Sequence, residues 1–336
     1  MLFRSHDGTA ANLPEAELLQ PFSDVTGGLS ELATFDPKIG GLEVLEVPGL
    51  GPKLHWTVYR WYNVAGDHFP GHGWSDLDLS NPNAQGLWQL GEYHNQQTAG
   101  YIFTAPQAFA DEHLSGQRLV AGLNIQQGVA TSSQGPALFS FSPWATNQAI
   151  PPNGETLATT PMLLYPFEVA TIPDHKNPDE WEGGVWVEAD GKEAVLNVGR
   201  KSMGPERYGL PEEGDCSQHQ GYHGDPYAPQ ILFFDPADLV AAAQGGREPW
   251  QTVPYARASL ENDIIETCEY FQTGAAYDSA NQLLYILQPD ADTVSNEFEP
   301  YPVINVFRVE GGSGEPAPPV ETPWRVFLSF IGHLIK

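Results

Sequence analysis

The chain has 336 residues, with 43 acidic and 15 basic side chains and a formal net charge of −28. A charge of this size and sign excludes a nucleic-acid binder that works through a basic face. Gly and Pro number 34 and 30, yet 41% of the residues are hydrophobic and 11% are aromatic. The composition therefore indicates a turn-rich folded protein and not a disordered one.

Residues 40–310 consist of short runs rich in Val, Ile, Tyr, Phe and Trp, separated by clusters of Gly, Pro, Asn and Asp. This pattern predicts an all-β domain, preceded by an N-terminal segment, residues 1–39, that could supply a ring-closing strand. Two short helices interrupt the pattern, at residues 106–114 and 235–245. The second begins with an Asp-Pro pair and ends at a Gly, which are typical helix boundaries.

A weak repeat runs through this region, in which Gln or Glu precedes a step of small residues and then an apolar strand. Its members are Gln85, Gln134, Glu182 and Gln272. The first three lie about 48 residues apart, which suits a four-stranded blade whose inner strand needs small residues near an axis. The last interval, of about 90 residues, suits one blade with a long inserted loop. We therefore expect a single five-bladed β-propeller, whose first blade starts near residue 40.

This layout resembles the five-bladed propellers found among carbohydrate-active proteins, over residues 40–310. The resemblance is architectural, because the Asp-box of sialidases, S-x-D-x-G-x-T-W, is absent, as are the GxSxG, P-loop and GxGxxG motifs. It implies a site in the central funnel and carries no catalytic residues across. A protein made of two β-sandwich domains is the main alternative.

In a propeller, several blades deliver side chains to the funnel and to the loops above one face. Three glutamines of the repeat are predicted substrate-binding groups, unless they only satisfy backbone groups between blades: Gln85, Gln134 and Gln272. Glu182 is a predicted catalytic carboxylate. Two tryptophans in polar surroundings, Trp74 and Trp181, are predicted stacking platforms for a sugar ring.

The insertion, residues 199–227, gathers cations, tyrosines and histidines in an otherwise acidic chain. Arg200 is predicted to neutralise a uronate carboxylate, with Tyr222 and His223 as catalytic base and acid. The insertion also supplies predicted substrate-binding residues: Lys201, Tyr208 and Tyr227. Alternatively, it is a disulfide-pinned loop whose cations pair with its own carboxylates.

His219, His223 and Asp225 form a predicted metal-binding set within the insertion. The Gly and Pro content favours loops there, so the spacing fixes no geometry, and unliganded surface histidines are the alternative. The acidic loop at residues 289–297 is a candidate Ca²⁺ site, although it lacks the full ligand spacing of an EF-hand. The predicted chemistry requires no cofactor.

Cys216 and Cys268 are the only cysteines, and their polar surroundings favour a disulfide over two free thiols. A disulfide would suit an extracellular or periplasmic location, although the first twenty residues lack the apolar core of a signal peptide. Residues 311–323 form a Gly/Pro-rich linker. The apolar segment that follows, residues 324–336, is shorter than the roughly 20 residues of a transmembrane helix and could dock on the body, a partner or a membrane surface.

These features predict a secreted glycan-active enzyme, either a glycoside hydrolase or a polysaccharide lyase, that acts on a polysaccharide or oligosaccharide. A hydrolase would depend on Glu182 and a second carboxylate, whereas a lyase would use Tyr222 or His223 with Arg200. No nucleic acid and no transmembrane segment are expected. The alternative is a non-catalytic extracellular protein that binds glycans or metal or has a structural role.

Overall fold

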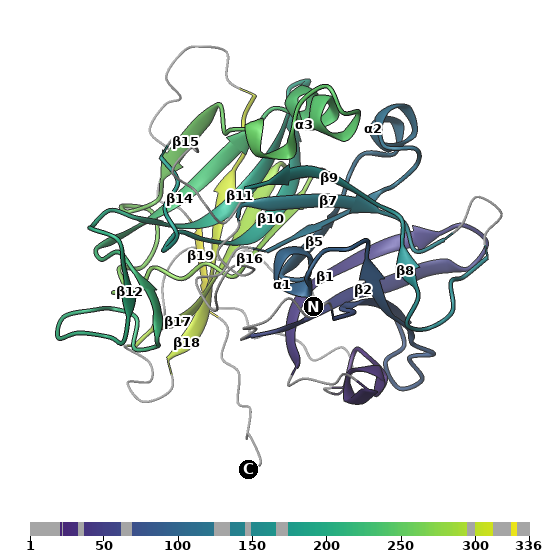
Figure 1. Cartoon of the computed structure of the whole chain (residues 1–336), viewed down its shortest axis with the longest axis horizontal. Coiled ribbons are helices and arrows are strands. Elements are labelled where there is room, and N and C mark those ends of the chain that lie inside the picture. The colour runs from purple at the N-terminus through teal and green to yellow at the C-terminus, as the bar shows by residue number, and fades with distance from the viewer. Residues whose placement is uncertain are drawn as a thin grey trace.

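The computed structural model describes residues 21, 23–32, 37–61, 69–123, 135–144, 149–165, 174–293, 300–311 and 324–327. These residues form an all-β protein in which four antiparallel sheets stand as blades in a propeller-like arrangement (Figure 1). The expected fold class is therefore confirmed. The predicted number of blades is wrong, because the structure has four and not five.

Blade 1 contains four strands that pair in chain order: β1 (Pro37–Val47), β2 (Gly51–Arg60), β3 (His72–Asp76) and β4 (Gln85–Leu90). The 3-10 helix η2 (Leu29–Leu32) precedes this blade and lies against β4. A short strand from the next blade, β8 (Thr156–Leu157), pairs parallel with β4 and extends the sheet. Blade 1 is thereby joined at its outer edge to blade 2.

Blade 2 has four strands in antiparallel order: β5 (Tyr101–Thr104), β6 (Leu119–Gly122), β7 (Ala137–Phe141) and β9 (Thr159–Leu164). The buried helix α1 (Asn95–Thr98) leads into β5 and packs on β2. The helix α2 (Gln107–His113) connects β5 to β6 and confirms the first predicted helix.

Blade 3 contains the insertion and has four strands of its own: β10 (Glu180–Ala189), β11 (Lys192–Ser202), β14 (Tyr227–Phe234) and β15 (Ala256–Ser259). The insertion folds into a hairpin between β11 and β14, made of β12 (Arg207–Gly209) and β13 (Gly221–His223). Between β14 and β15 lie α3 (Pro236–Ala243) and the 3-10 helix η4 (Pro249–Gln251). Asp235 caps α3 by accepting a hydrogen bond from the backbone N–H of Ala237 at 2.8 Å, which confirms the second predicted helix.

Blade 4 consists of β16 (Gly274–Asp278), β17 (Leu283–Asp292), β18 (Tyr301–Arg308) and β19 (Trp324–Phe327). Because β19 belongs to the predicted apolar tail and pairs antiparallel with β18, this part of the tail docks on the body. In the N-terminal segment predicted to supply a ring-closing strand, residues 23–32 hold turns and η2, and residues 37–39 begin β1. Residues 1–20, 22 and 33–36 lie outside the described part of the chain. Among the residues that the structure describes, no helix is long and apolar enough to cross a membrane.

The first strands of the four blades pack in series, β1 against β5, β5 against β10 and β10 against β16. Their close approach requires residues without side chains. A Cβ on Gly41 would lie 2.5 Å from the backbone nitrogen of Ile102, and one on Gly184 would lie 2.6 Å from the ring of Tyr101. The crowding predicted for inner strands is therefore present at these junctions.

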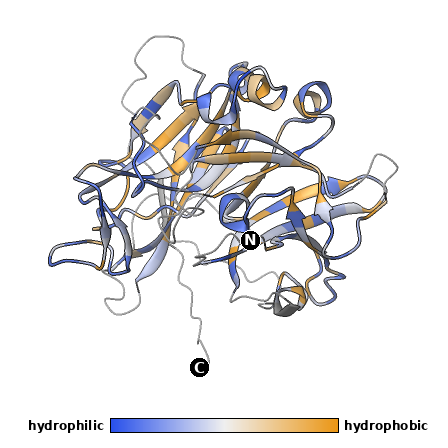
Figure 2. Ribbon diagram, viewed as in Figure 1, coloured by the Kyte–Doolittle hydropathy of each residue, from blue (hydrophilic) through white to orange (hydrophobic). Residues whose placement is uncertain are grey.

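Three hydrophobic cores fill the spaces between consecutive blades. The first lies between blades 1 and 2 around Trp74 and Trp88, the second between blades 2 and 3 around Phe103 and Trp186, and the third between blades 3 and 4 around Val185. Neighbouring residues of β10 thus point into different cores, as the two-residue period of a strand requires. Figure 2 shows hydrophobic residues along the central strands and a largely hydrophilic β12–β13 hairpin.

The repeat misplaced two blade starts because small residues also occur at strand crossings away from the axis. Gln85 begins β4, the last strand of blade 1, and a Cβ on Gly86 would lie 2.5 Å from the Cα of Gly73 on β3. The strand after Gln134 is β7, the third strand of blade 2. The starts near residues 40, 182 and 272 do coincide with β1, β10 and β16.

Candidate functional site

The insertion is tied to the chain that leads into blade 4. The disulfide Cys216–Cys268 joins the loop between β12 and β13 to the segment before β16, with the two Cα atoms 5.3 Å apart. The predicted pairing of the two cysteines is therefore confirmed. The bridge brings polar residues of blade 3 next to residues at the start of blade 4.

Arg200, near the end of β11, is 1% exposed and lies at the centre of this polar region. Its guanidinium is 2.7 Å from the carboxylate of Glu180, donates to the backbone carbonyl of Glu269 at 2.9 Å, and is 3.7 Å from the carboxylate of that residue. The rings of Tyr227 and Phe271 lie 4.2 and 4.1 Å from its Cζ. Protein groups therefore occupy the contacts that a substrate uronate was predicted to make.

Lys201 is also buried and donates to both oxygens of Asp179 at 3.0 and 2.9 Å. Asp179 accepts a further bond from the backbone N–H of Ser202 at 2.9 Å. The pocket beside this pair, with His175 on its wall, has room for about one water molecule. A sugar ring does not fit there, which argues against the predicted substrate contact of Lys201.

Glu182 lies at a β-bulge in the inner strand of blade 3. Trp181 and Gly183 pair with consecutive residues of β11, so Glu182 has no partner in the ladder. The residue is 8% exposed, and its Oε1 has no hydrogen-bond partner within the described part of the chain. Burial raises the pKa of Glu182 well above its ordinary value, the charge of Glu180 raises it further, and Arg200 opposes the shift. The protonated form is thereby favoured.

Glu269, unlike Glu182, is in contact with solvent, since 29% of its side chain is exposed. Burial raises the pKa of Glu269, whereas the nearby Arg200 lowers it. Tyr59 of β2 lies near the same charges, because Glu182 and Glu180 add to the effect of burial in raising the pKa of its phenol. One carboxylate cluster, defined by Glu180, Glu182 and Glu269 around Arg200, therefore joins blade 3 to the segment before β16.

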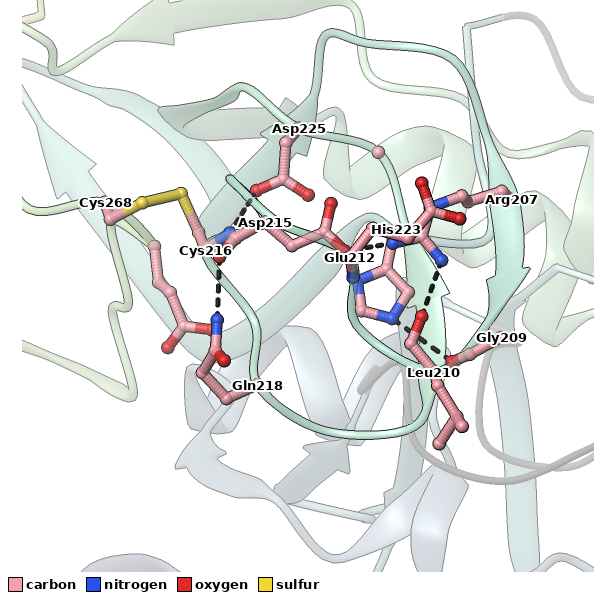
Figure 3. Close-up of polar contacts among 12 residues, drawn as sticks. Arg207, Gly209, Leu210, Glu212, Asp215, Cys216, Gln218, His223, Asp225 and Cys268 are labelled. Carbon is pink, nitrogen blue, oxygen red and sulfur yellow. Dashed lines mark hydrogen bonds and ion pairs between the residues drawn. A yellow bond between two sulfur atoms is a disulfide. The ribbon is translucent and has the colours of Figure 1, made fainter.

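A second cluster lies in the insertion itself, where Asp215, His223 and Asp225 place one ligand atom each within 4.8 Å of one another (Figure 3). His223 and Asp225 belong to the predicted metal set. His219, the third residue of the predicted set, is exposed and lies outside this group. Asp215 takes its place.

The glutamines predicted to ring the funnel are placed differently in the part of the chain that the structure describes. Gln85 lies on the outer strand of blade 1, and Gln134 lies outside the described residues. Gln272 is 2% exposed and donates to the carbonyl of Tyr270. Of the candidate Ca²⁺ loop, Asp290 and Asp292 end β17, and residues 294–297 lie outside the described part of the chain.

The aromatic residues predicted to bind sugar differ in how much of their side chains is exposed. Trp74 and Trp181 are each 1% exposed and pack into cores between blades, so their predicted role as sugar platforms is not supported. Tyr208 and Tyr222 face each other across the β12–β13 hairpin, with ring centroids 5.0 Å apart, and Tyr208 is 43% exposed. Tyr227 instead covers Arg200.

Two residues that sequence reasoning missed, Asp215 and Glu269, each stand beside a cysteine of the disulfide. The sequence feature that could have identified them is that Asp215 precedes Cys216 and Glu269 follows Cys268. A disulfide between the two cysteines brings these carboxylates into one region. The sequence could not show which cation each carboxylate meets, since that depends on how β11 and the hairpin fold back.

No known family model matches the chain, and no curated protein matches it closely enough to count as a relative. The fold and the two clusters therefore define its class. It is an all-β, propeller-like protein of four blades with a buried carboxylate cluster and an adjoining disulfide-linked insertion.

Proposed function

We propose that the protein is a glycan-active enzyme, and specifically a glycoside hydrolase. The observation that carries the proposal is the carboxylate cluster, in which Glu182 is buried and favoured in its protonated form while Glu269 reaches solvent. Cleavage of a glycosidic bond needs one carboxylic acid to protonate the leaving oxygen and a second carboxylate to act as base or nucleophile. Glu182 would be the acid and Glu269 the second carboxylate.

The tyrosine pair supports a carbohydrate substrate. Tyr208 and Tyr222 lie on the hairpin of the same disulfide-linked insertion that approaches Glu269. Aromatic rings with one exposed face bind the apolar face of a sugar ring. The pair therefore supplies an aromatic binding surface on the insertion, in the role that the sequence assigned to two tryptophans.

A hydrolase is better supported than a lyase. A lyase was predicted to use Arg200 against a uronate, but Glu180 and Glu269 already balance this arginine. His223, its predicted acid or base, has its Nε2 3.3 Å from the carbonyl of Gly209. A chain of net charge −28 also repels polyanionic glycans, so the substrate would be a neutral polysaccharide.

The disulfide supports placing the enzyme outside the cytoplasm, in an extracellular or periplasmic compartment. Such bridges persist in oxidising compartments and are rare where glutathione and thioredoxin keep thiols reduced. Polysaccharide substrates of this kind are met in the same compartments.

The test is release of reducing ends from a panel of neutral, uronate-containing and sulfated polysaccharides. We expect release from a neutral member, and Glu182→Gln should lower the rate at least about 100-fold, the usual contribution of a general acid. The matched control is Glu43→Gln, because Glu43 is a partly buried carboxylate on an inner strand whose pKa is also raised by burial. Silence across the panel, or full turnover by the Glu182 variant, would contradict the proposal.

The tyrosine pair would serve a non-catalytic glycan-binding protein equally well. Affinity electrophoresis of the wild type and of Tyr208→Ala in gels that contain the same polysaccharides separates the two functions. Retardation that depends on Tyr208, without release of reducing ends, assigns the protein to binding.

A further inference from the structure

Three ligand-type side chains converge in the insertion, away from the carboxylate cluster. Asp215 precedes the disulfide cysteine, His223 ends β13, and Asp225 follows two residues later. The Nδ1 atom of His223 is 3.4 Å from Oδ2 of Asp215. Two ligands that share one tetrahedral metal ion are separated by about 3.3 Å, for bonds of about 2.05 Å. The observed separation would therefore let both atoms bind one ion.

The imidazole is held in the orientation that a metal ligand needs. His223 is 1% exposed, and its Nε2 faces the backbone carbonyl of Gly209 at 3.3 Å. Donation from Nε2 to that carbonyl leaves the lone pair on Nδ1, which points at the two aspartates. Nδ1 has no hydrogen-bond partner among the described residues. Metal-bound histidines are commonly fixed by such a bond from the second ring nitrogen.

Asp225 contributes a second buried atom that lacks a partner. Its Oδ1 accepts a hydrogen bond from the backbone N–H of Cys216 at 2.8 Å, which fixes the carboxylate beside the disulfide. Its Oδ2 is buried and has no hydrogen-bond partner within the described ranges. A buried carboxylate oxygen without a partner is costly, so this atom needs a cation or a donor.

The side chains around the cluster also carry a net negative charge that a divalent cation could balance. Asp215 accepts from Arg207 and from the backbone N–H of Glu212 at 2.6 Å, and the carboxylate of Glu212 is 3.8 Å from Arg207. The carboxylates of Asp215 and Glu212 therefore share one guanidinium, and Asp225 adds a third carboxylate to the cluster. Two negative charges remain, which a divalent ion would balance.

We infer that Asp215, His223 and Asp225 form a binding site for a divalent transition metal ion such as Zn²⁺. One imidazole nitrogen and two carboxylate oxygens are ligands that Zn²⁺ accepts, and they leave a fourth position for water. Ca²⁺ is disfavoured because it takes oxygen ligands and needs more of them. The site lies on the hairpin and the disulfide, so it is distinct from the proposed acid Glu182.

The test is a calorimetric titration of the tag-free, chelator-treated full chain with Zn²⁺, followed by Ca²⁺. We expect one Zn²⁺ ion bound per chain, with an affinity lowered at least about 10-fold by His223→Ala and by the near-isosteric Asp225→Asn. The matched control is His219→Ala, an exposed histidine of the same insertion, which should bind like the wild type.

Circular dichroism and thermal unfolding of each variant show that a loss of binding is not a loss of fold. The inference is wrong if the wild type binds no stoichiometric Zn²⁺, if His223→Ala and Asp225→Asn leave the affinity unchanged, or if His219→Ala weakens it equally. A preference for Ca²⁺ would also overturn it. The titration involves no glycan, so its outcome is independent of the proposed hydrolase activity.

Discussion

Glu43 lies on β1, where its carboxylate accepts a hydrogen bond from Thr104 of β5 at 2.9 Å. Burial raises the pKa of Glu43 from 4.5 to about 7, and the bond from Thr104 and the charge of Arg118 only partly offset this. The folded state therefore holds this proton more tightly than the unfolded chain. The resulting stabilisation is complete below about pH 4.5 and is lost as the pH rises through about 7.

Glu43→Gln keeps an uncharged side chain at this position at every pH. We expect the variant to exceed the wild type in free energy of unfolding at pH 8 by up to about 3 kcal/mol, and to match it near pH 4.5. Urea unfolding at pH 4.5, 6 and 8 measures the difference. A difference that stays constant across these pH values would show that the carboxyl does not titrate as its burial requires.

At the scale of residues, the amino-acid sequence predicted which segment is rich in charged side chains, but not which side chains form ion pairs with one another. The concentration of cations in an acidic chain pointed to residues 199–227 as a candidate site, and the repeat pointed to Glu182. The partners of Arg200 come from β10 and from the segment before β16, at long range along the chain. No local pattern could show that Glu180 and Glu269 would take both sides of this arginine.

At the scale of elements, Gly199 sets the approach of β11 to β10 beside the bulge at Glu182. A Cβ at this position would lie 2.0 Å from the carbonyl oxygen of Glu180 and 2.8 Å from the Cα of Trp181. Gly199→Ala must therefore displace the backbone of β10. We expect a loss of about 1 to 3 kcal/mol in the free energy of unfolding, the usual range for overpacking a core.

The control for this prediction is Gly274→Ala on β16, where the nearest atom to the added Cβ is 3.7 Å away. That distance is ordinary van der Waals contact, so the control should unfold at the urea concentration of the wild type. Equal unfolding midpoints for the Gly199 and Gly274 variants would show that β10 accommodates the extra methyl group.

Strand content and the two longer helices were readable from local pattern, whereas the number of blades was not. The pattern at Gln85 marks a tight crossing of β3 and β4, and Leu87 and Gly86 there have φ values of 48° and 143°. The inner strand of blade 2, β5, has only four residues, and the Gln97-Thr98-Ala99-Gly100 step before it does not fall on the spacing of about 48 residues. Irregularities within sheets and short inner strands thus break a repeat that assumes uniform blades.

At the scale of the whole molecule, each consecutive pair of blades shares one hydrophobic core, and polar links cross the same junctions. The junction of blades 3 and 4 holds a hydrophobic core around Val185, the ion pair between Arg200 and Glu269, and the disulfide. The proposed acid Glu182 and the proposed metal ligands lie on the blade 3 side of this junction, so its rigidity affects both.

The disulfide Cys216–Cys268 closes a loop with a sequence separation of 52, which contains β13, β14, α3 and β15. Loop-closure entropy predicts that the double variant Cys216→Ser, Cys268→Ser loses about 4 kcal/mol of unfolding free energy. Urea unfolding of the variant, and of the wild type with and without a reductant, measures the loss. The reduced wild type is the control and should unfold like the double variant.

Because Cys216 donates to Asp225 and Cys268 precedes Glu269, opening the bridge should also weaken Zn²⁺ binding and slow glycan turnover together. Both effects follow from looser positioning, so they should appear at temperatures where the variant remains folded. A double variant that keeps wild-type stability, Zn²⁺ affinity and turnover would show that the strands of blades 3 and 4 position these residues without the bridge.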